Sequence, residues 1–153
     1  MEPRIYEYKS STKWTGGHKG RLSSEEKHSI EVACPPEFGG DPGYWTPEHL
    51  FVSSVEVCIL TTFLSIFEKS GGNLVSYESQ AVGKASMKNW VFQFNDVDIM
   101  PTVVVETEED VRKAEEAMER AVNECLITKS LKFKPKVRPR VQSVRSHDKK
   151  GDG

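Results

Sequence analysis

One long apolar run, residues 50–67, constrains the fold of this chain most strongly. A membrane span needs about 20 predominantly apolar residues, and this shorter run is interrupted by Glu56 and by several serines and threonines. We therefore interpret it as a buried helix. Its apolar residues point in nearly every direction around the helix axis, so all its faces must be covered. In a chain of 153 residues, that requires sheets, other helices or a second subunit around it.

The residues before the run form a helix start. Thr46 can cap the free amides of the first turn, Pro47 suits the first helical position, and Glu48 complements the helix dipole. Gly71 and Gly72 provide a stop. The sequence therefore predicts a helix from Pro47 to about Lys69.

Strand-forming segments lie on both sides of this helix, separated by turn residues. The expected strands are residues 5–14, 21–22, 30–33, 74–87, 90–105 and 136–144. A glycine-rich loop is expected at 37–45, and Pro139 predicts a sheet edge for the last strand. The fold class is α+β. We expect one domain over residues 1–145 and a disordered tail at 146–153.

A second helix is predicted after Thr107, which begins a motif resembling a capping box. The apolar residues that follow are spaced by alternating steps of three and four, which places them on a single helix face. They are Val111, Ala114, Met118, Ala121 and Cys125.

The three cysteines, Cys34, Cys58 and Cys125, exclude some classes of protein. Their odd, small number argues against a secreted disulfide framework, and the lack of CxxC spacing argues against a zinc ribbon. Unpaired thiols suit a reducing compartment, and residues 1–20 contain no apolar signal segment, so we expect a cytoplasmic protein. We expect no metal and no other cofactor.

The charge balance bears on partners. The chain has 21 Lys and Arg residues and 23 Asp and Glu residues, a net charge of −2. This balance argues against broad electrostatic binding to nucleic acid. We expect neither a nucleic acid nor a membrane as a partner.

Cys58 lies inside the predicted buried helix, and Cys125 lies on the inward face of the second helix. Two such helices in one small domain usually share a core, so the two sulfurs can approach each other. Most unpaired cysteines, however, act only as small buried hydrophobes. Periodicity alone therefore leaves the role of this pair open, and we interpret Cys34 as structural.

A resemblance gives the pair a role. Residues 46–71 (TPEHLFVSSVEVCILTTFLSIFEKSG) resemble the OsmC/Ohr family of thiol peroxidases, in which a Pro-Glu-x-Leu segment leads into a buried helix that bears the reactive cysteine. Here those residues are Pro47, Glu48, Leu50 and Cys58. Residues 121–131 resemble the element with the family's second cysteine, here Cys125. Residues 14–20 and 75–84 also resemble family segments.

The resemblance implies antiparallel sheets wrapped around a long buried central helix, in an intertwined homodimer with active sites at the subunit interface. It also implies a peroxidase for hydroperoxides, more specifically organic ones, in oxidative-stress defence. Cys58 attacks the peroxide and becomes a sulfenic acid, and Cys125 condenses with it to a disulfide. An external dithiol of the lipoyl or thioredoxin type then reduces the disulfide.

The expected activating cation differs from the family pattern. One family branch places an arginine after the N-terminal glycine pair, where this chain has His18, with Arg21 nearby; the other takes an arginine from a loop that here, at 37–45, contains no Lys or Arg. We expect Arg21 to be the cation that activates Cys58, with His18 as the second choice. Glu48 is expected to orient that cation. Ten residues of straight helix rise roughly 15 Å, so Glu48 and Cys58 cannot meet within one helix. We therefore predict a site built from both subunits.

Two alternatives remain open on the sequence. One is a non-catalytic, stress-associated dimeric binding protein of the same fold, favoured by the missing arginine. The other is a different enzyme built on a long helix wrapped by a sheet, such as a hot-dog-like thioesterase, in which the cysteines are incidental.

Overall fold

The computed structural model describes residues 2–144, so the predicted tail at 146–153 lies outside the described residues. The chain divides into two compact units, Met1–Phe51 and Val52–Gly153. The expectation of one domain over residues 1–145 remains a prediction. The α+β class is confirmed: helices and sheets both occur, and most of the predicted elements are present.

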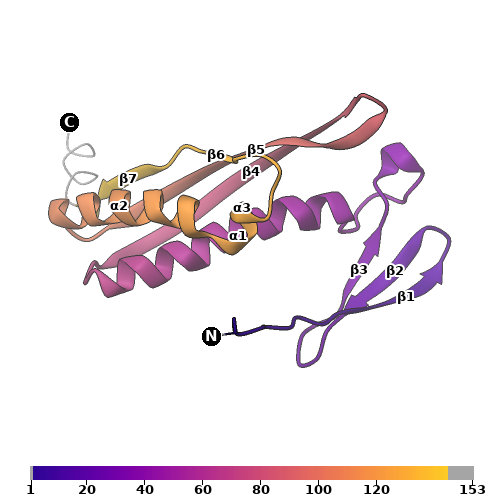
Figure 1. The fold of residues 1–153 in the computed structure, drawn as a ribbon, viewed down its shortest axis with the longest axis horizontal. Coiled ribbons are helices and arrows are strands. Elements are labelled where there is room, and N and C mark those ends of the chain that lie inside the picture. Colours follow the sequence, from indigo (N-terminus) through magenta and orange to yellow (C-terminus); the bar gives the residue numbers. More distant parts are fainter. Residues whose placement is uncertain (1, 145–153) are drawn as a thin grey trace. The chain divides into compact units, whose positions relative to one another are not determined.

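The first unit contains a three-stranded antiparallel sheet in the order β1-β2-β3 (Figure 1). Its strands are β1 (Ser11–Gly16), β2 (Lys19–Ser23) and β3 (Ile30–Ala33), followed by the short 3-10 helix η1 (Pro36–Phe38). The predicted strand at residues 5–10 is wrong. The pairing of β1 with β2 begins at Ser11 opposite Ser23, so residues 5–10 have no partner strand and remain exposed.

The second unit contains the larger sheet. A long antiparallel hairpin joins β4 (Leu74–Lys88) to β5 (Val91–Val105), through a turn in which Asn89 and Trp90 both have positive φ. Two short strands, β6 (Lys136–Val137) and β7 (Arg140–Ser143), run parallel to β5. The sheet is therefore mixed, because helix α2 (Glu108–Glu124) carries the chain back between β5 and β6 and makes the parallel return possible.

The edge position predicted from Pro139 is confirmed. The residue separates β6 from β7, and both strands pair with β5. Proline cannot donate to a strand ladder, which is why the predicted strand at 136–144 is split in two.

Helix α1 (Pro47–Lys69) begins and ends where the sequence predicts. The Thr46 side chain accepts a hydrogen bond from the backbone N–H of His49 at 3.1 Å, as the capping prediction required. Gly71 follows the helix with a φ of +81°, a conformation that suits glycine at a helix end.

Within the second unit, α1 has one stripe of buried side chains. The stripe consists of Val55, Ile59, Phe63 and Phe67. The Phe63 ring lies 5.5 Å from the ring of Tyr77 on β4. On another face, Val57 is 52% exposed and Leu64 is 37% exposed. A single chain therefore does not bury the helix on all faces.

Among the described residues, α1 is also the helix that is long and apolar enough to cross a membrane, with a mean hydropathy of 2.0 over 18 residues. Length and composition alone do not distinguish such a span from the core helix of a soluble protein. Within the single chain, 22% of this window is buried, and Phe63 packs on Tyr77 of β4.

Helix α2 follows Thr107, whose hydroxyl accepts a hydrogen bond from the backbone N–H of Asp110 at 3.2 Å. Its buried face contains Ala114, Met118 and Ala121, as predicted. The chain then forms a short helix, α3 (Leu126–Lys129), which was not predicted because four residues are too few to show a helical period.

Candidate active site

Cys58 lies near the middle of α1 and is half-buried. It follows Val57, which belongs to the exposed face of the helix. Its backbone carbonyl accepts a hydrogen bond from the Thr61 hydroxyl at 3.2 Å, and this contact holds the helix turn that carries the sulfur. The Cys58 side chain is therefore anchored on rigid backbone at the margin of the packed stripe.

Cys125 lies at the break between α2 and α3, one residue past the last helical residue of α2. Its backbone has an extended ψ of 127°, so α2 ends there and α3 begins in a new direction. The Cys125 N–H still donates to the Ala121 carbonyl at 3.0 Å, and the Cys125 carbonyl accepts from Lys129 N–H at 3.1 Å. The side chain is fully buried, at the end of the apolar stripe that the sequence predicted.

The structure joins the two cysteines as a disulfide across 67 residues of sequence. Their Cα atoms are 6.1 Å apart, within the range that a disulfide bridges. The small side chains of Ala114, Ala117 and Ala121 line the buried face of α2 and leave room for a close approach. The approach of Cys58 to Cys125, left open by periodicity, is thus observed.

Glu56 is a half-buried acidic residue of α1. Its carboxylate accepts a hydrogen bond from the Ser79 hydroxyl on β4 at 2.5 Å. The neighbouring Tyr77 hydroxyl is buried and has no hydrogen-bond partner within residues 2–144. Burial, and secondarily the charge of Glu56, raise the pKa of Tyr77 to about 12.

Tyr77 and Ser79 were not identified from the sequence as neighbours of Glu56. The signal was present, because both occupy alternate positions of β4, which place them on the same face of the sheet. Which residue of the helix they meet depends on how α1 packs on the sheet.

The other predicted site residues belong to the first unit. Arg21 is exposed, and its Nε lies 2.7 Å from the Glu31 carboxylate across the β2–β3 pair. His18 is exposed at the β1–β2 turn. Glu48 is half-buried, and its buried Oε2 has no hydrogen-bond partner among the described residues. The roles of these three residues beside Cys58 remain predictions.

Cys34 takes no part in the disulfide. It is a free, half-buried cysteine in the first unit, and its Sγ lies 3.7 Å from the Phe38 carbonyl. Among residues 2–144, no cluster of three His, Cys, Asp or Glu side chains is arranged to hold a metal ion.

The model of the OsmC-like protein family matches residues 39–140, a span that contains both paired cysteines and more than half of the chain. The chain belongs to the OsmC-like family. No curated protein sequence matches it.

Solved OsmC-like structures share the fold. An OsmC-like protein of unknown function from Vibrio cholerae superposes with a TM-score of 0.81 at 18% identity, covering 88% of this chain and 99% of that one. An organic hydroperoxide resistance protein from Elizabethkingia anophelis gives a TM-score of 0.70 at 20% identity, covering 92% and 98%. One from Legionella pneumophila gives 0.67 at 19% identity, covering 88% and 97%. At these identities the likeness shows the OsmC-like fold, which replaces the hot-dog-like alternative.

Proposed function

We propose that this OsmC-like protein is a thiol-dependent peroxidase that reduces organic hydroperoxides. The single observation that carries the proposal is the pairing of Cys58 with Cys125 at a Cα–Cα separation of 6.1 Å. Two of the structurally similar proteins are named organic hydroperoxide resistance proteins, which supports the choice of substrate class.

The proposed cycle begins with the Cys58 thiolate, the nucleophilic form of the thiol. Its sulfur attacks the terminal peroxide oxygen, the O–O bond breaks, and the alkoxide leaves and takes up a proton as the alcohol. Cys58 is then a sulfenic acid. The Cys125 thiol attacks that sulfur, releases water and closes the disulfide. Two electrons pass from the two thiols to the peroxide, and an external dithiol returns them.

The difference in burial supports the assignment of roles. Cys58 is half-buried, whereas Cys125 is fully buried. A peroxide reaches the more accessible sulfur first, so Cys58 is the peroxidatic residue. Cys125 then needs only to meet the neighbouring sulfur, and it protects the sulfenic acid from irreversible oxidation. The reductant, a lipoyl-type or thioredoxin-type dithiol, attacks Cys58 for the same reason.

A homodimer is part of the proposal. Val57 and Leu64 are seven residues apart, which places them on the same face of α1, and both are exposed in the single chain. A second subunit covering this face brings its surface beside Cys58. Partner residues then complete a site whose apolar surroundings suit an organic hydroperoxide.

The cation that lowers the thiol pKa is proposed to be His18. Arg21 is already paired with Glu31, which makes it less available than the sequence suggested. No hydrogen bond or ion pair involves the His18 side chain within residues 2–144. A positive charge beside a thiol favours the thiolate, because an opposite charge stabilises the ionised form.

Thiol counting after a single turnover tests the proposal. The reduced protein receives one equivalent of cumene hydroperoxide, and its free thiols are then titrated in denaturant. The wild type must lose two of its three thiols to an intramolecular disulfide. Cys34→Ser is the matched control and must also lose two, whereas Cys58→Ser must lose none. A wild type that keeps all its thiols contradicts the proposal.

One observation favours a second candidate, a non-catalytic dimeric binding protein. The loop at 37–45 has no Lys or Arg, and Arg21 is engaged with Glu31. In this alternative the Cys58–Cys125 disulfide is structural. The reduced thiols then react with cumene hydroperoxide no faster than free cysteine does.

A further inference from the structure

The segment that returns to the large sheet carries basic residues at every second position. We call Lys136, Arg138 and Arg140 the basic ladder. All three are exposed; Val137 between Lys136 and Arg138 is half-buried, and Pro139 between Arg138 and Arg140 is exposed. The alternation is that of an extended chain, in which successive side chains point to opposite sides.

Strand pairing places the ladder on one face of the sheet. Lys136 is opposite Asp98 on β5, and Arg140 is opposite Thr102. These β5 residues alternate with Val97, Ile99 and Val103, which are fully buried. The ladder therefore belongs to the face of the sheet that points away from α1 and α2.

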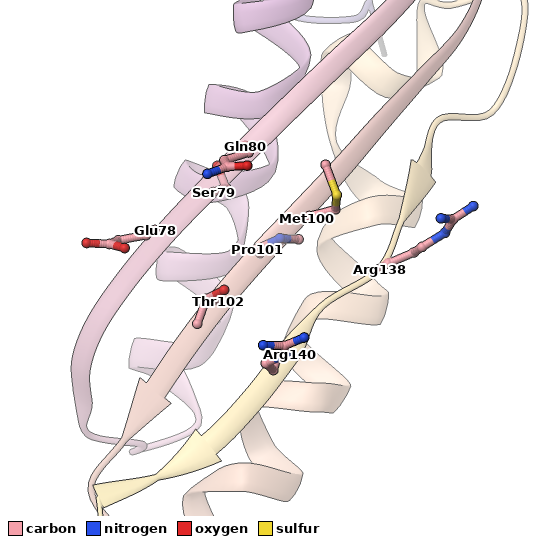
Figure 2. Close-up of a pocket in the computed structure, with 8 residues that line it drawn as sticks. All are labelled: Glu78, Ser79, Gln80, Met100, Pro101, Thr102, Arg138 and Arg140. Atoms are coloured by element: carbon pink, nitrogen blue, oxygen red, sulfur yellow. The ribbon is translucent and has the colours of Figure 1, made fainter. Parts of the chain in front are cut away.

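A hollow of about 690 Å³ lies beside the ladder on this face, lined by Arg138 and Arg140 together with residues of β4 and β5. Figure 2 shows both arginines on the edge segment, with Met100 and Thr102 between them and β4. The acidic residue of the hollow, Glu78, points away from both arginines (Figure 2). Arg140 lies over the sheet near Thr102, whereas the Arg138 side chain extends outward from the edge segment (Figure 2).

Two carboxylates of β5 near the ladder are each paired with a lysine, one of them with Lys136 of the ladder itself. Asp96 pairs with Lys136 at 3.2 Å, and Asp98 pairs with Lys84 at 3.8 Å. Within residues 2–144, no ion pair involves Arg138 or Arg140. Lysines and prolines on an edge strand also protect it from aggregation, but that role does not require two unpaired arginines along a hollow.

We infer that the basic ladder and its hollow dock an extended acidic segment of a partner protein, with carboxylates at every second residue. Alternate residues of an extended chain recur about every 6.6–6.8 Å, so an acidic strand has the same repeat as the ladder. Pro135 and Pro139 lack N–H groups, and recognition therefore depends mainly on side chains. Arginine forks hold carboxylates in a bidentate manner.

A short acidic peptide fits the charge distribution better than nucleic acid or a membrane does. The chain has a net charge of −2, and Glu115 and Glu119 on α2 line another hollow next to Lys134. A long polyanion or an anionic surface extends beyond the ladder and meets this acidic helix. A peptide a few residues long contacts only the basic ladder.

Fluorescence anisotropy with the full chain tests the inference. The probe is a labelled dodecapeptide with glutamate and serine alternating, at low and at physiological salt. We expect saturable binding that is weakened by salt, and at least threefold weaker binding of a peptide with the same composition but all glutamates in one block. No saturable binding, or equal binding of the two peptides, overturns the proposal. Tighter binding of oligothymidylate or of phosphatidylserine vesicles overturns it as well.

Variants locate the surface. Arg138→Gln/Arg140→Gln is expected to weaken the alternating peptide about fivefold, from two exposed charge pairs. Lys9→Gln/Lys27→Gln removes the same charge from exposed positions of the first unit and should change Kd less than twofold. Equal weakening by both double variants contradicts a specific surface. Circular dichroism melting checks that both variants are folded.

Discussion

Helix α1 presents two apolar faces that differ in what covers them. Val55, Ile59, Phe63 and Phe67 are buried within the single chain, whereas Val57 and Leu64 remain exposed. Cys58 follows Val57 and so lies beside the uncovered face. The apolar composition of α1 requires that both faces be covered, and a single chain covers only one of them.

The largest expected effect comes from the covered face. Phe63→Ala removes a fully buried ring and should lower the free energy of unfolding by about 3–5 kcal/mol. Leu64→Ala, the adjacent control, should cost under about 1.5 kcal/mol at low protein concentration. Urea unfolding monitored by circular dichroism measures both. Equal losses at the two positions would mean that the two faces do not differ.

A substitution on the uncovered face should change the oligomeric state of the protein. Val57→Asp places a charge in the proposed interface, which costs about 2 kcal/mol or more, and should shift the protein from dimer to monomer at micromolar concentration. Val82→Asp on the other side of the sheet is the control, because Val82 is 49% exposed and Val57 is 52% exposed. Light scattering after size exclusion reports the mass. A monomeric wild type, or a Val57→Asp dimer, contradicts the proposed role of this face.

The cation assignment extends the comparison to reactivity. Removing a charge that lowers the Cys58 pKa by one unit reduces the thiolate fraction about tenfold. We expect His18→Ala to slow peroxide reduction, and the variant to recover as the pH rises and its Cys58 thiol ionises without help. Arg21→Gln should stay within twofold, because Glu31 already engages Arg21. Single-turnover rates of both variants from pH 6 to 9 test this assignment. If Arg21→Gln slows the reaction more than His18→Ala does, Arg21 is the cation instead.

The smallest expected effect concerns Tyr77, which packs under the covered face. Its pKa is raised to about 12 in the folded protein by burial and by Glu56, against about 10 in the unfolded chain. Between these values the unfolded state has lost the proton and the folded state keeps it, so stability falls as the pH rises from 10 to 12. Tyr77→Phe should lessen this loss by about 1 kcal/mol. Urea unfolding midpoints of the wild type and of Tyr77→Phe at pH 9 and 11.5 measure this difference. An equal loss of stability in the two proteins contradicts the raised pKa of Tyr77.

Local signals in the sequence predicted the helices well. Thr46 and Pro47 fixed the start of α1, and the spacing of Ala114, Met118 and Ala121 defined the face of α2 that leads to Cys125. These features depend on neighbours within a few residues. The cysteine pairing was also anticipated, but its role came from the family resemblance.

Features that depend on distant partners were missed. Residues 5–10 have strand-like composition but no strand opposite them, and the parallel return of β6 and β7 depends on the path of α2. The Ser79 partner of Glu56 follows from how α1 packs on β4. Periodicity along one segment contains none of this information.

The central claim is that Cys58 is the sulfur that takes the peroxide oxygen. The most direct measurement is trapping with dimedone in Cys125→Ser, which lacks the thiol that otherwise consumes the sulfenic acid. After one equivalent of cumene hydroperoxide, peptide mass spectrometry should find a single dimedone adduct on Cys58 and none on Cys34. An adduct mainly on Cys34, or no adduct on any cysteine, contradicts the account.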